Sequence, residues 1–328
     1  MILKSQLEQV VNKQFEWMSS KKKDIAREQA KSVDATAGFA SIITGIRRCG
    51  KSTLMKQIMG RYKKEDTLYL NFDDIHLSSF EKDDFVRLYS LIAERKAKVL
   101  FFDEIQLVSG WEVFVHQLLR EEYMVYITGS NASMLSAELG THLTGRHLST
   151  ELFPFSYEEY LTFCNKKRGK DSFLSYLTDG GMPEYLSTHD SRVPVSMVDD
   201  ILVRDIAIRH GIRNLEPMKR LAVYLLTNVA KPFSGNRLTS VIGDISTSTV
   251  LDYVDYMRDA YLIDTASQYT TNIRASIRNP KKVYAIDTGI VSCVRLSQTD
   301  AISAEIPIPS TTQTGKRQSL LLSWQRRV

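Results

Sequence analysis

The sequence of 328 residues has few features of secreted, metal-stapled or membrane proteins. Its three cysteines, Cys49, Cys164 and Cys293, lie far apart and form no C-x-x-C pair. Neither a disulfide framework nor a structural zinc site is therefore expected. No run of about 18 apolar residues occurs, and the first residues lack an apolar signal core. We expect a cytoplasmic chain with reduced thiols and no membrane partner.

The composition that remains is that of a folded protein. Hydrophobic residues make up 43% and charged residues 25%, which excludes largely disordered and collagen-like classes. The formal net charge of +5 permits a nucleic-acid partner but is too small to argue for one. At roughly 150 residues per domain, the length predicts about two domains.

The first half of the chain reads as a helical lead-in followed by an α/β core. Residues 1–38 carry apolar residues at helical spacing, from Leu3 to Phe15. Residues 39–150 alternate between short apolar runs and amphipathic segments. The expected strands cover residues 40–44, 67–72, 98–102 and 124–128, and the expected helices cover 52–62, 80–95 and 111–121. This alternation predicts a parallel sheet with helices on both faces.

The second half is expected to form three further segments. Residues 151–213 read as a mostly helical lid or linker. Residues 214–296 predict three helices followed by two strands, an order typical of a winged helix. Residues 297–328 are rich in Ser, Thr and Gln without periodicity, and we expect a disordered or poorly packed tail.

A complete G-x-x-x-x-G-K-[ST] motif follows the first expected strand, and a helix follows the motif. The glycines let the backbone curl so that amides face phosphate oxygens, while the lysine reaches the β- and γ-phosphates. The serine offers a hydroxyl to Mg²⁺, so the motif predicts ATP and Mg²⁺ as ligands. The expected nucleotide-binding residues are Gly45, Ile46, Arg47, Arg48, Cys49, Gly50, Lys51, Ser52 and Thr53.

Two features of this motif keep alternative interpretations. Arg47 and Arg48 either add positive charge near the phosphates or face solvent, and we favour the second. Cys49 is interpreted as a small filler residue. The alternative is a thiol whose oxidation disturbs phosphate binding.

An apolar strand ends in two carboxylates at Asp103 and Glu104. A carboxylate at a strand end beside the phosphate-binding loop can hold the magnesium shell, and Asp103 fits this role. The next carboxylate can polarise the attacking water, and Glu104 fits that one. The pair favours hydrolysis over binding alone; the alternative is a solvated strand end.

Polar residues also follow the expected strand at 124–128. Ser130 or Asn131 either senses the γ-phosphate and the attacking water or caps the next helix. Arg146 lies on the loop beyond and is a candidate arginine finger for a neighbouring subunit's nucleotide. The alternative for Arg146 is an ordinary surface residue.

Taken in order, these motifs resemble the AAA+ superfamily and, more narrowly, a prokaryotic family of predicted ATPases. The resemblance covers roughly residues 1–296, and its specific signatures include F-F-D-E-I-Q at 101–106, T-G-S at 128–130 and G-G-M-P-E at 180–184. It implies that Lys51 and Ser52 contact phosphate and Mg²⁺, and that Asp103 and Glu104 form the magnesium and water-activating pair. It further implies a sensor at Ser130 or Asn131 and a finger at Arg146, hence a homo-oligomer.

In the family that the chain resembles, a winged helix follows the AAA-type domain, and a nuclease-like domain of unknown function often comes next. Residues 297–328 lack the expected spread of acids and lysine of such a nuclease site, since Asp300 and Glu305 are their only acids, so we expect a truncated or frame-shifted end. Residues 201–296 carry 13 Lys and Arg against 8 Asp and Glu. DNA contact through the winged helix and docking of a protein partner both stay open, as does a nucleotide-binding scaffold with little turnover.

Overall fold

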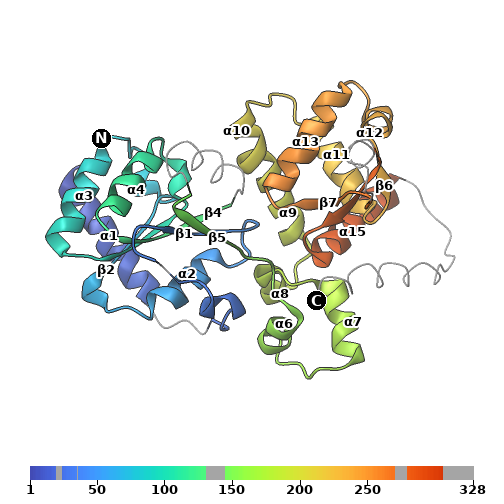
Figure 1. The fold of residues 1–328 in the computed structure, drawn as a ribbon. Helices are drawn as coiled ribbons and strands as arrows, with labels where there is room; N and C mark the ends of the chain where they lie inside the picture. The colour runs from blue at the N-terminus through green and yellow to red at the C-terminus, as the bar shows by residue number, and fades with distance from the viewer. Residues whose placement is uncertain (20–23, 35, 131–144, 270–278, 306–328) are drawn as a thin grey trace. The chain divides into compact units, whose positions relative to one another are not determined.

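The computed structural model describes residues 1–19, 24–34, 36–130, 145–269 and 279–305, without the side chains of 298–305. The chain divides into two compact units, Met1–Ser172 and Phe173–Val328. Figure 1 shows that unit 1 holds a sheet flanked by helices and that unit 2 is mostly helical.

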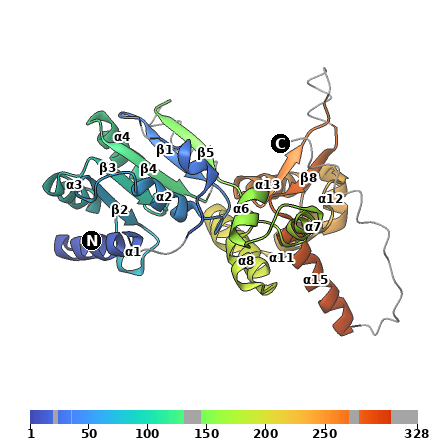
Figure 2. The same ribbon diagram turned by 90° about the horizontal axis from the view of Figure 1, so that it is seen from below.

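Unit 1 is built on a five-stranded sheet in the order β2-β3-β4-β1-β5, in which all paired strands are parallel. Figure 2 shows β5 at one edge beside β1. Every residue of β1 and β3 is buried, as expected for a parallel sheet covered on both faces. The strands are β1 (Ala40–Thr44), β2 (Thr67–Asn71), β3 (Val99–Asp103), β4 (Met124–Gly129) and β5 (His147–Glu151).

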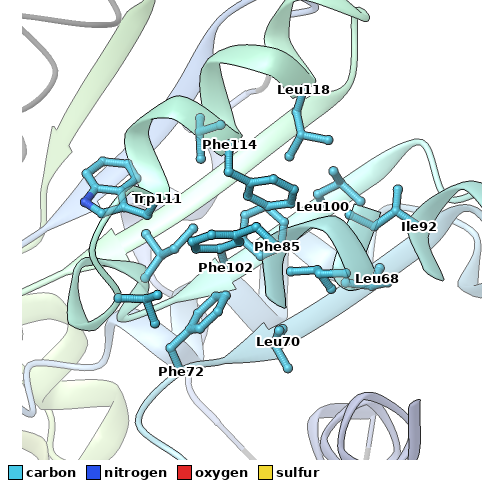
Figure 3. Close-up of a cluster of buried hydrophobic side chains, with 14 of the residues drawn as sticks. Leu68, Leu70, Phe72, Phe85, Ile92, Leu100, Phe102, Trp111, Phe114 and Leu118 are labelled. Atoms are coloured by element: carbon cyan, nitrogen blue, oxygen red, sulfur yellow. The ribbon is translucent and has the colours of Figure 1, made fainter. Parts of the chain in front are cut away.

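The two faces of the sheet pack against different helices. Alternate strand residues such as Leu70 and Phe102 join a buried cluster with residues of α1, α3 and α4 (Figure 3). On the other face, Phe101 stacks on Tyr126 with ring centroids 4.7 Å apart, and Tyr62, just beyond α2, packs on both rings. The helices of unit 1 are α1 (Lys4–Ser19), α2 (Lys51–Met59), α3 (Asp84–Arg95), α4 (Trp111–Arg120) and α6 (Tyr157–Phe163).

The predicted α/β class with a parallel sheet is confirmed, and the four expected strands lie within two residues of their predicted limits. The sequence analysis missed β5. This strand reads His-Leu-Ser-Thr-Glu, and none of its residues is buried because it forms the edge of the sheet. An edge strand with one apolar residue carries almost no hydrophobic pattern, so only its pairing with β1 reveals it.

Unit 2 begins within α7 (Lys170–Asp179) and continues through a row of helices. Its antiparallel sheet has the order β6-β8-β7. The helices are α8 (Pro183–Thr188), α9 (Arg192–Asp200), a π-helical segment (Ile201–Ala207), α10 (Ile208–His210), α11 (Glu216–Thr227), α12 (Gly235–Ile242), α13 (Thr247–Asp259) and α15 (Thr288–Glu305). The strands are β6 (Pro232–Phe233), β7 (Ile263–Ala266) and β8 (Lys281–Ala285).

Asp287 joins two segments of unit 2 that are distant in sequence. Its Oδ1 accepts hydrogen bonds from the backbone N–H of Gly289 and Ile290 at the start of α15. Its Oδ2 accepts one from Gly181 N at 2.6 Å. Burial raises the pKa of Asp287 to about 6, although these three hydrogen bonds act in the opposite direction. The carboxylate therefore caps α15 and ties it to the turn before α8.

The first part of the predicted tail is helical. The change of composition after Leu296 predicted a disordered or poorly packed tail from residue 297, and α15 continues to Glu305. The helix starts from the Asp287 cap and buries Ile290, Val291 and Val294, so its first turns are anchored by packing. A polar composition beyond that anchored part does not end a helix. The remainder of the predicted tail, residues 306–328, lies outside the described residues.

Candidate functional site

The loop 45–52, from Gly45 to Ser52, connects the end of β1 to the start of α2. Gly45 has φ +149°, and a Cβ on it would lie 2.2 Å from the carbonyl oxygen of Leu152. Gly50 has φ +101°, and a Cβ there would lie 2.9 Å from Arg27 Nη1. Backbone conformation therefore requires glycine at both positions, and at Gly45 the close approach of the Leu152 backbone requires it as well. The first-turn amides of α2 and its positive dipole end lie at this loop.

Lys51 projects from the first turn of α2 back toward the loop. Its side chain is only 5% exposed, and its Nζ donates to the carbonyls of Gly45 at 3.0 Å and Ile46 at 3.2 Å. The same ammonium lies 3.9 Å from Glu104 Oε1, at the end of β3. The motifs that follow β1 and β3 thus converge on one ammonium group.

The strand β4 lies between β1 and β3 and connects the two motifs. Thr128 on β4 is fully buried, and its Oγ1 donates to Asp103 Oδ1 while it accepts from the backbone N–H of Glu104 at 3.1 Å. Tyr69 on β2 donates to Asp103 Oδ2 at 2.9 Å. Asp103 is therefore oriented by hydroxyl groups from both neighbouring strands.

Glu104 adopts a left-handed backbone conformation, with φ +53°, immediately after β3. Burial raises the pKa of its carboxyl group above the ordinary value. The negative charge of Asp103 raises this pKa further, whereas Lys51 and a hydrogen bond from Gln106 oppose the shift. A carboxylate with a raised pKa is better suited to accept a proton near neutral pH.

A buried arginine, Arg27, holds the loop 45–52 through a hydrogen bond to its backbone. Arg27 is 2% exposed, and its guanidinium donates to Cys49 O at 2.6 Å and Phe153 O at 2.7 Å. Its Nε donates to Glu159 Oε1 at 2.9 Å, and its guanidinium carbon lies 5.0 Å from the ring centroid of Phe155. Glu159 also completes the capping box at the start of α6 with Ser156. One side chain therefore connects the loop, the segment after β5 and α6.

The remaining residues of the loop differ in exposure. Cys49 is fully buried, and its Sγ donates to Leu152 O at 3.4 Å. Burial also raises the pKa of the Cys49 thiol, which favours the interpretation as a small filler over that as an oxidisable group. Arg48 is exposed, in line with the preferred solvent-facing interpretation, while Arg47, Ser52 and Thr53 are half-buried.

The other predicted site residues fall at three different places. Ser130 is buried directly after β4, close in sequence to Thr128. Asn131 lies outside the described residues. Arg146 is exposed and precedes β5, and its carbonyl accepts from Ala40 N at the amino end of β1. The loop 45–52 follows the opposite, carboxyl end of β1, roughly 15 Å away at the rise of a strand. The structure therefore does not bring Arg146 to this chain's own loop.

The donor set suits Mg²⁺ bound together with a nucleotide. Among the described residues, no group of three or more His, Cys, Asp or Glu side chains could hold a metal ion by itself. Ser52 and Asp103 offer one hydroxyl and one carboxylate. Mg²⁺ is usually bound through one or two carboxylates, substrate phosphates and water, so these two residues fit such a site.

Comparison with known proteins assigns the class of unit 1. Residues 38–161 match the family described as AAA domain, and residues 170–301 match a domain of unknown function (DUF8612). Unit 1 thus contains an AAA domain, the class of nucleotide-binding ATPase domain that the motifs resemble. The winged helix and the nuclease-like domain stay predictions.

An uncharacterized protein of Haemophilus influenzae is 31% identical over 273 residues, covering 77% of this chain and 68% of the relative. The chain belongs to the same family of AAA-domain proteins as this relative. An uncharacterized protein of Methanocaldococcus jannaschii is 33% identical over 266 residues, covering 75% of this chain and 60% of the relative. The chain therefore spans about three fifths of the archaeal relative's length.

A solved structure is similar at lower identity. It is a signal transduction ATPase with numerous domains and a tetratricopeptide repeat sensor, from Pyrococcus horikoshii. It is 15% identical, covers 85% of this chain and 44% of its own chain, and has a TM-score of 0.37.

Sequence reasoning missed four residues that hold the site: Arg27, Tyr69, Gln106 and Thr128. Thr128 and Gln106 lie inside the quoted signatures T-G-S and F-F-D-E-I-Q, so the signatures contained them without indicating their roles. Tyr69 looked like an ordinary strand residue. Arg27 had no signal, because it lies 18 residues before Gly45 in a polar segment.

The Arg27–Glu159 pair should contribute strongly to the stability of unit 1. Arg27→Met leaves Glu159 buried without its cation, and we expect the free energy of unfolding to fall by about 3–5 kcal/mol. The double change Arg27→Met with Glu159→Met should cost less. Urea unfolding measures both, followed by tryptophan fluorescence, to which Trp111, buried in unit 1, contributes.

Arg61→Met is the matched control. It removes an exposed pair, Arg61 Nη1 to Asp34 Oδ1 at 3.1 Å, and should cost at most about 1 kcal/mol. If Arg27→Met costs no more than Arg61→Met, Arg27 does not hold the loop.

Proposed function

We propose that the chain is a Mg²⁺-dependent ATPase whose active site is formed by the loop 45–52 and the two carboxylates after β3. The observation that supports this most strongly is the 3.9 Å separation between Lys51 Nζ and Glu104 Oε1. It brings a phosphate-binding cation and a proton acceptor to one place. A nucleotide-binding scaffold with little turnover would not require a carboxylate there.

In the proposed reaction, the loop amides and Lys51 bind the β- and γ-phosphates of ATP. Water attacks the γ-phosphorus, the bond to the β–γ bridging oxygen breaks, and ADP and phosphate are released. Glu104 accepts the proton that the water loses. Thr128 holds both acids in register, because it bonds to the side chain of Asp103 and to the backbone of Glu104.

Ser52 and Asp103 would hold Mg²⁺ in this site. The ion, when bound, neutralises charge on the β- and γ-phosphate oxygens. Tyr69 and Thr128 keep Asp103 in one orientation, and such outer contacts set how well a carboxylate can serve as a ligand.

We propose a role for Arg146 only in an assembly with a second copy of the chain. Its position at the amino end of β5 lies away from its own loop, so it can act as a finger only on a neighbour's nucleotide. Ser130, or Asn131 beyond it, is proposed to sense the γ-phosphate. A monomer with full turnover would remove the role of Arg146.

The test is ATP turnover with Mg²⁺ for the wild type and Glu104→Gln. The change removes the proton acceptor and keeps the size of the side chain, so we expect turnover to fall by about 10²–10⁴-fold while ATP binding is retained. Phosphate release measures turnover, and equilibrium titration with ATP measures binding.

Glu112→Gln is a suitable control, because this half-buried glutamate lies in the first turn of α4, eight residues along the chain from Glu104. It should turn over ATP like the wild type. Equal turnover in Glu104→Gln and the wild type would contradict the proposal.

We further propose that α11, α12 and α13 with β6, β7 and β8 form a winged helix, and that it docks a protein partner rather than DNA. In a helix-turn-helix arrangement α13 would be the recognition helix. The exposed residues of α13 include Asp252 and Asp255, whose carboxylates repel DNA phosphates. Arg258 Nη1 lies 3.0 Å from Asp255 Oδ1 and neutralises its charge, but it does not neutralise the charge of Asp252. Two further basic residues that lie between β7 and β8 in the sequence, Arg274 and Arg278, are outside the described residues.

Duplex DNA should therefore neither bind tightly nor stimulate turnover. Fluorescence anisotropy with a labelled duplex at low and at physiological salt, with phosphate release measured in parallel, checks this expectation. Salt-dependent binding that weakens in Lys281→Ala with Lys282→Ala, together with faster turnover, would favour the DNA-linked ATPase instead.

A further inference from the structure

Gln106 holds the carboxylate of Glu104 from the side opposite Lys51. Its Nε2 donates to Glu104 Oε2, while Glu104 Oε1 faces Lys51 Nζ. One oxygen of the carboxylate thus accepts a hydrogen bond from Gln106, and the other lies 3.9 Å from the Lys51 ammonium. Gln106 lies in a short 3₁₀ turn, Ile105–Leu107, that directly follows Glu104, so the amide and the carboxylate are held by the same stretch of backbone.

The oxygen of the same amide, Gln106 Oε1, destabilises the folded chain. Gln106 is 8% exposed, and its Oε1 has no hydrogen-bond partner in the described part of the chain. A buried, unpaired carbonyl oxygen costs about 1–3 kcal/mol. An apolar side chain of similar length would fill the space without this cost, so packing alone does not account for a glutamine here.

The geometry points to Gln106 as the positioning residue of Glu104. The inference rests on the proposed ATPase function. The amide N–H fixes the rotation of the carboxylate, so that its second oxygen stays on the side of Lys51 and of the nucleotide's terminal phosphate. The opposite amide orientation would place Gln106 Oε1 against a carboxylate that only accepts, so Nε2 is the atom that faces Glu104.

The experiment uses Gln106→Met in the full chain, because methionine has similar length and no donor. We expect kcat to fall about tenfold to a hundredfold, in line with the loss of a hydrogen bond to a charged group. KM for ATP should stay within about twofold, because Glu104 does not bind the phosphates. The free energy of unfolding, followed by tryptophan fluorescence, should be unchanged or higher, since the unpaired oxygen is removed.

A double-mutant cycle separates this role from a general disturbance of the site. If Gln106 acts through Glu104, Gln106→Met should cause no further loss of kcat in a Glu104→Gln background. Gln117→Met provides the matched control, because Gln117 donates to Glu121 in the same way on the exposed face of α4. Its kcat should equal that of the wild type.

The outcomes separate the inference from the proposed function. Turnover that is lost in Glu104→Gln but retained within about twofold in Gln106→Met would overturn the positioning role and leave the ATPase proposal intact. Turnover that is unaffected by Glu104→Gln would remove both. An unfolded Gln106→Met chain, or additive losses in the double variant, would assign Gln106 a structural role and contradict the inference.

Discussion

The parallel hydrogen-bonded ladder around β4 is the constraint on which the site depends. In this ladder Thr44 of β1 pairs with Gly129, and Phe102 of β3 pairs with Ile127. The carboxyl ends of all three strands therefore lie at one level of the sheet. A shift of β3 by one residue against its two neighbours would turn Asp103 to the opposite face and break its contacts with Thr128 and Tyr69, whereas a shift of β1 against β4 would displace the loop that precedes Lys51. The apolar packing that fixes the register is thus also what aligns the acids with Lys51.

The back of the loop 45–52 is held by a second set of contacts. Arg27 comes from the segment before β1, and its partners come from the loop itself, from the residues after β5 and from α6. A buried ion pair of this kind is weak support for stability by itself, because desolvation offsets much of the attraction. Its role here is to fix geometry, because the five N–H donors of one planar guanidinium group can bond to three segments at once. The conformation of the loop 45–52 therefore depends both on the strands of the sheet and on the hydrogen bonds of Arg27.

The fold of unit 1 was predictable because its strands are short apolar runs between turns and because the motifs mark the strand ends. Lys51, Asp103 and Glu104 could be assigned to one site from the rule that parallel strands end at one edge. The strand β5 could not be predicted, because a strand at an exposed edge has no hydrophobic pattern. Arg27 could not either, since its role depends on contacts with Phe153 and Glu159, more than 120 residues away. The helical continuation to Glu305 was not predicted, because the change to a Ser-, Thr- and Gln-rich composition was interpreted as the end of regular structure.

The most direct measurement is the affinity for a non-hydrolysable ATP analogue with and without Mg²⁺, for the wild type and Asp103→Asn. The account predicts tighter binding with Mg²⁺ in the wild type and little or no effect of Mg²⁺ in Asp103→Asn, because Asp103 is proposed to hold the ion. Binding without Mg²⁺ should be similar in both proteins. Wild-type binding that is absent, or that is equally strong with Mg²⁺ and with a chelator, would contradict the proposed site.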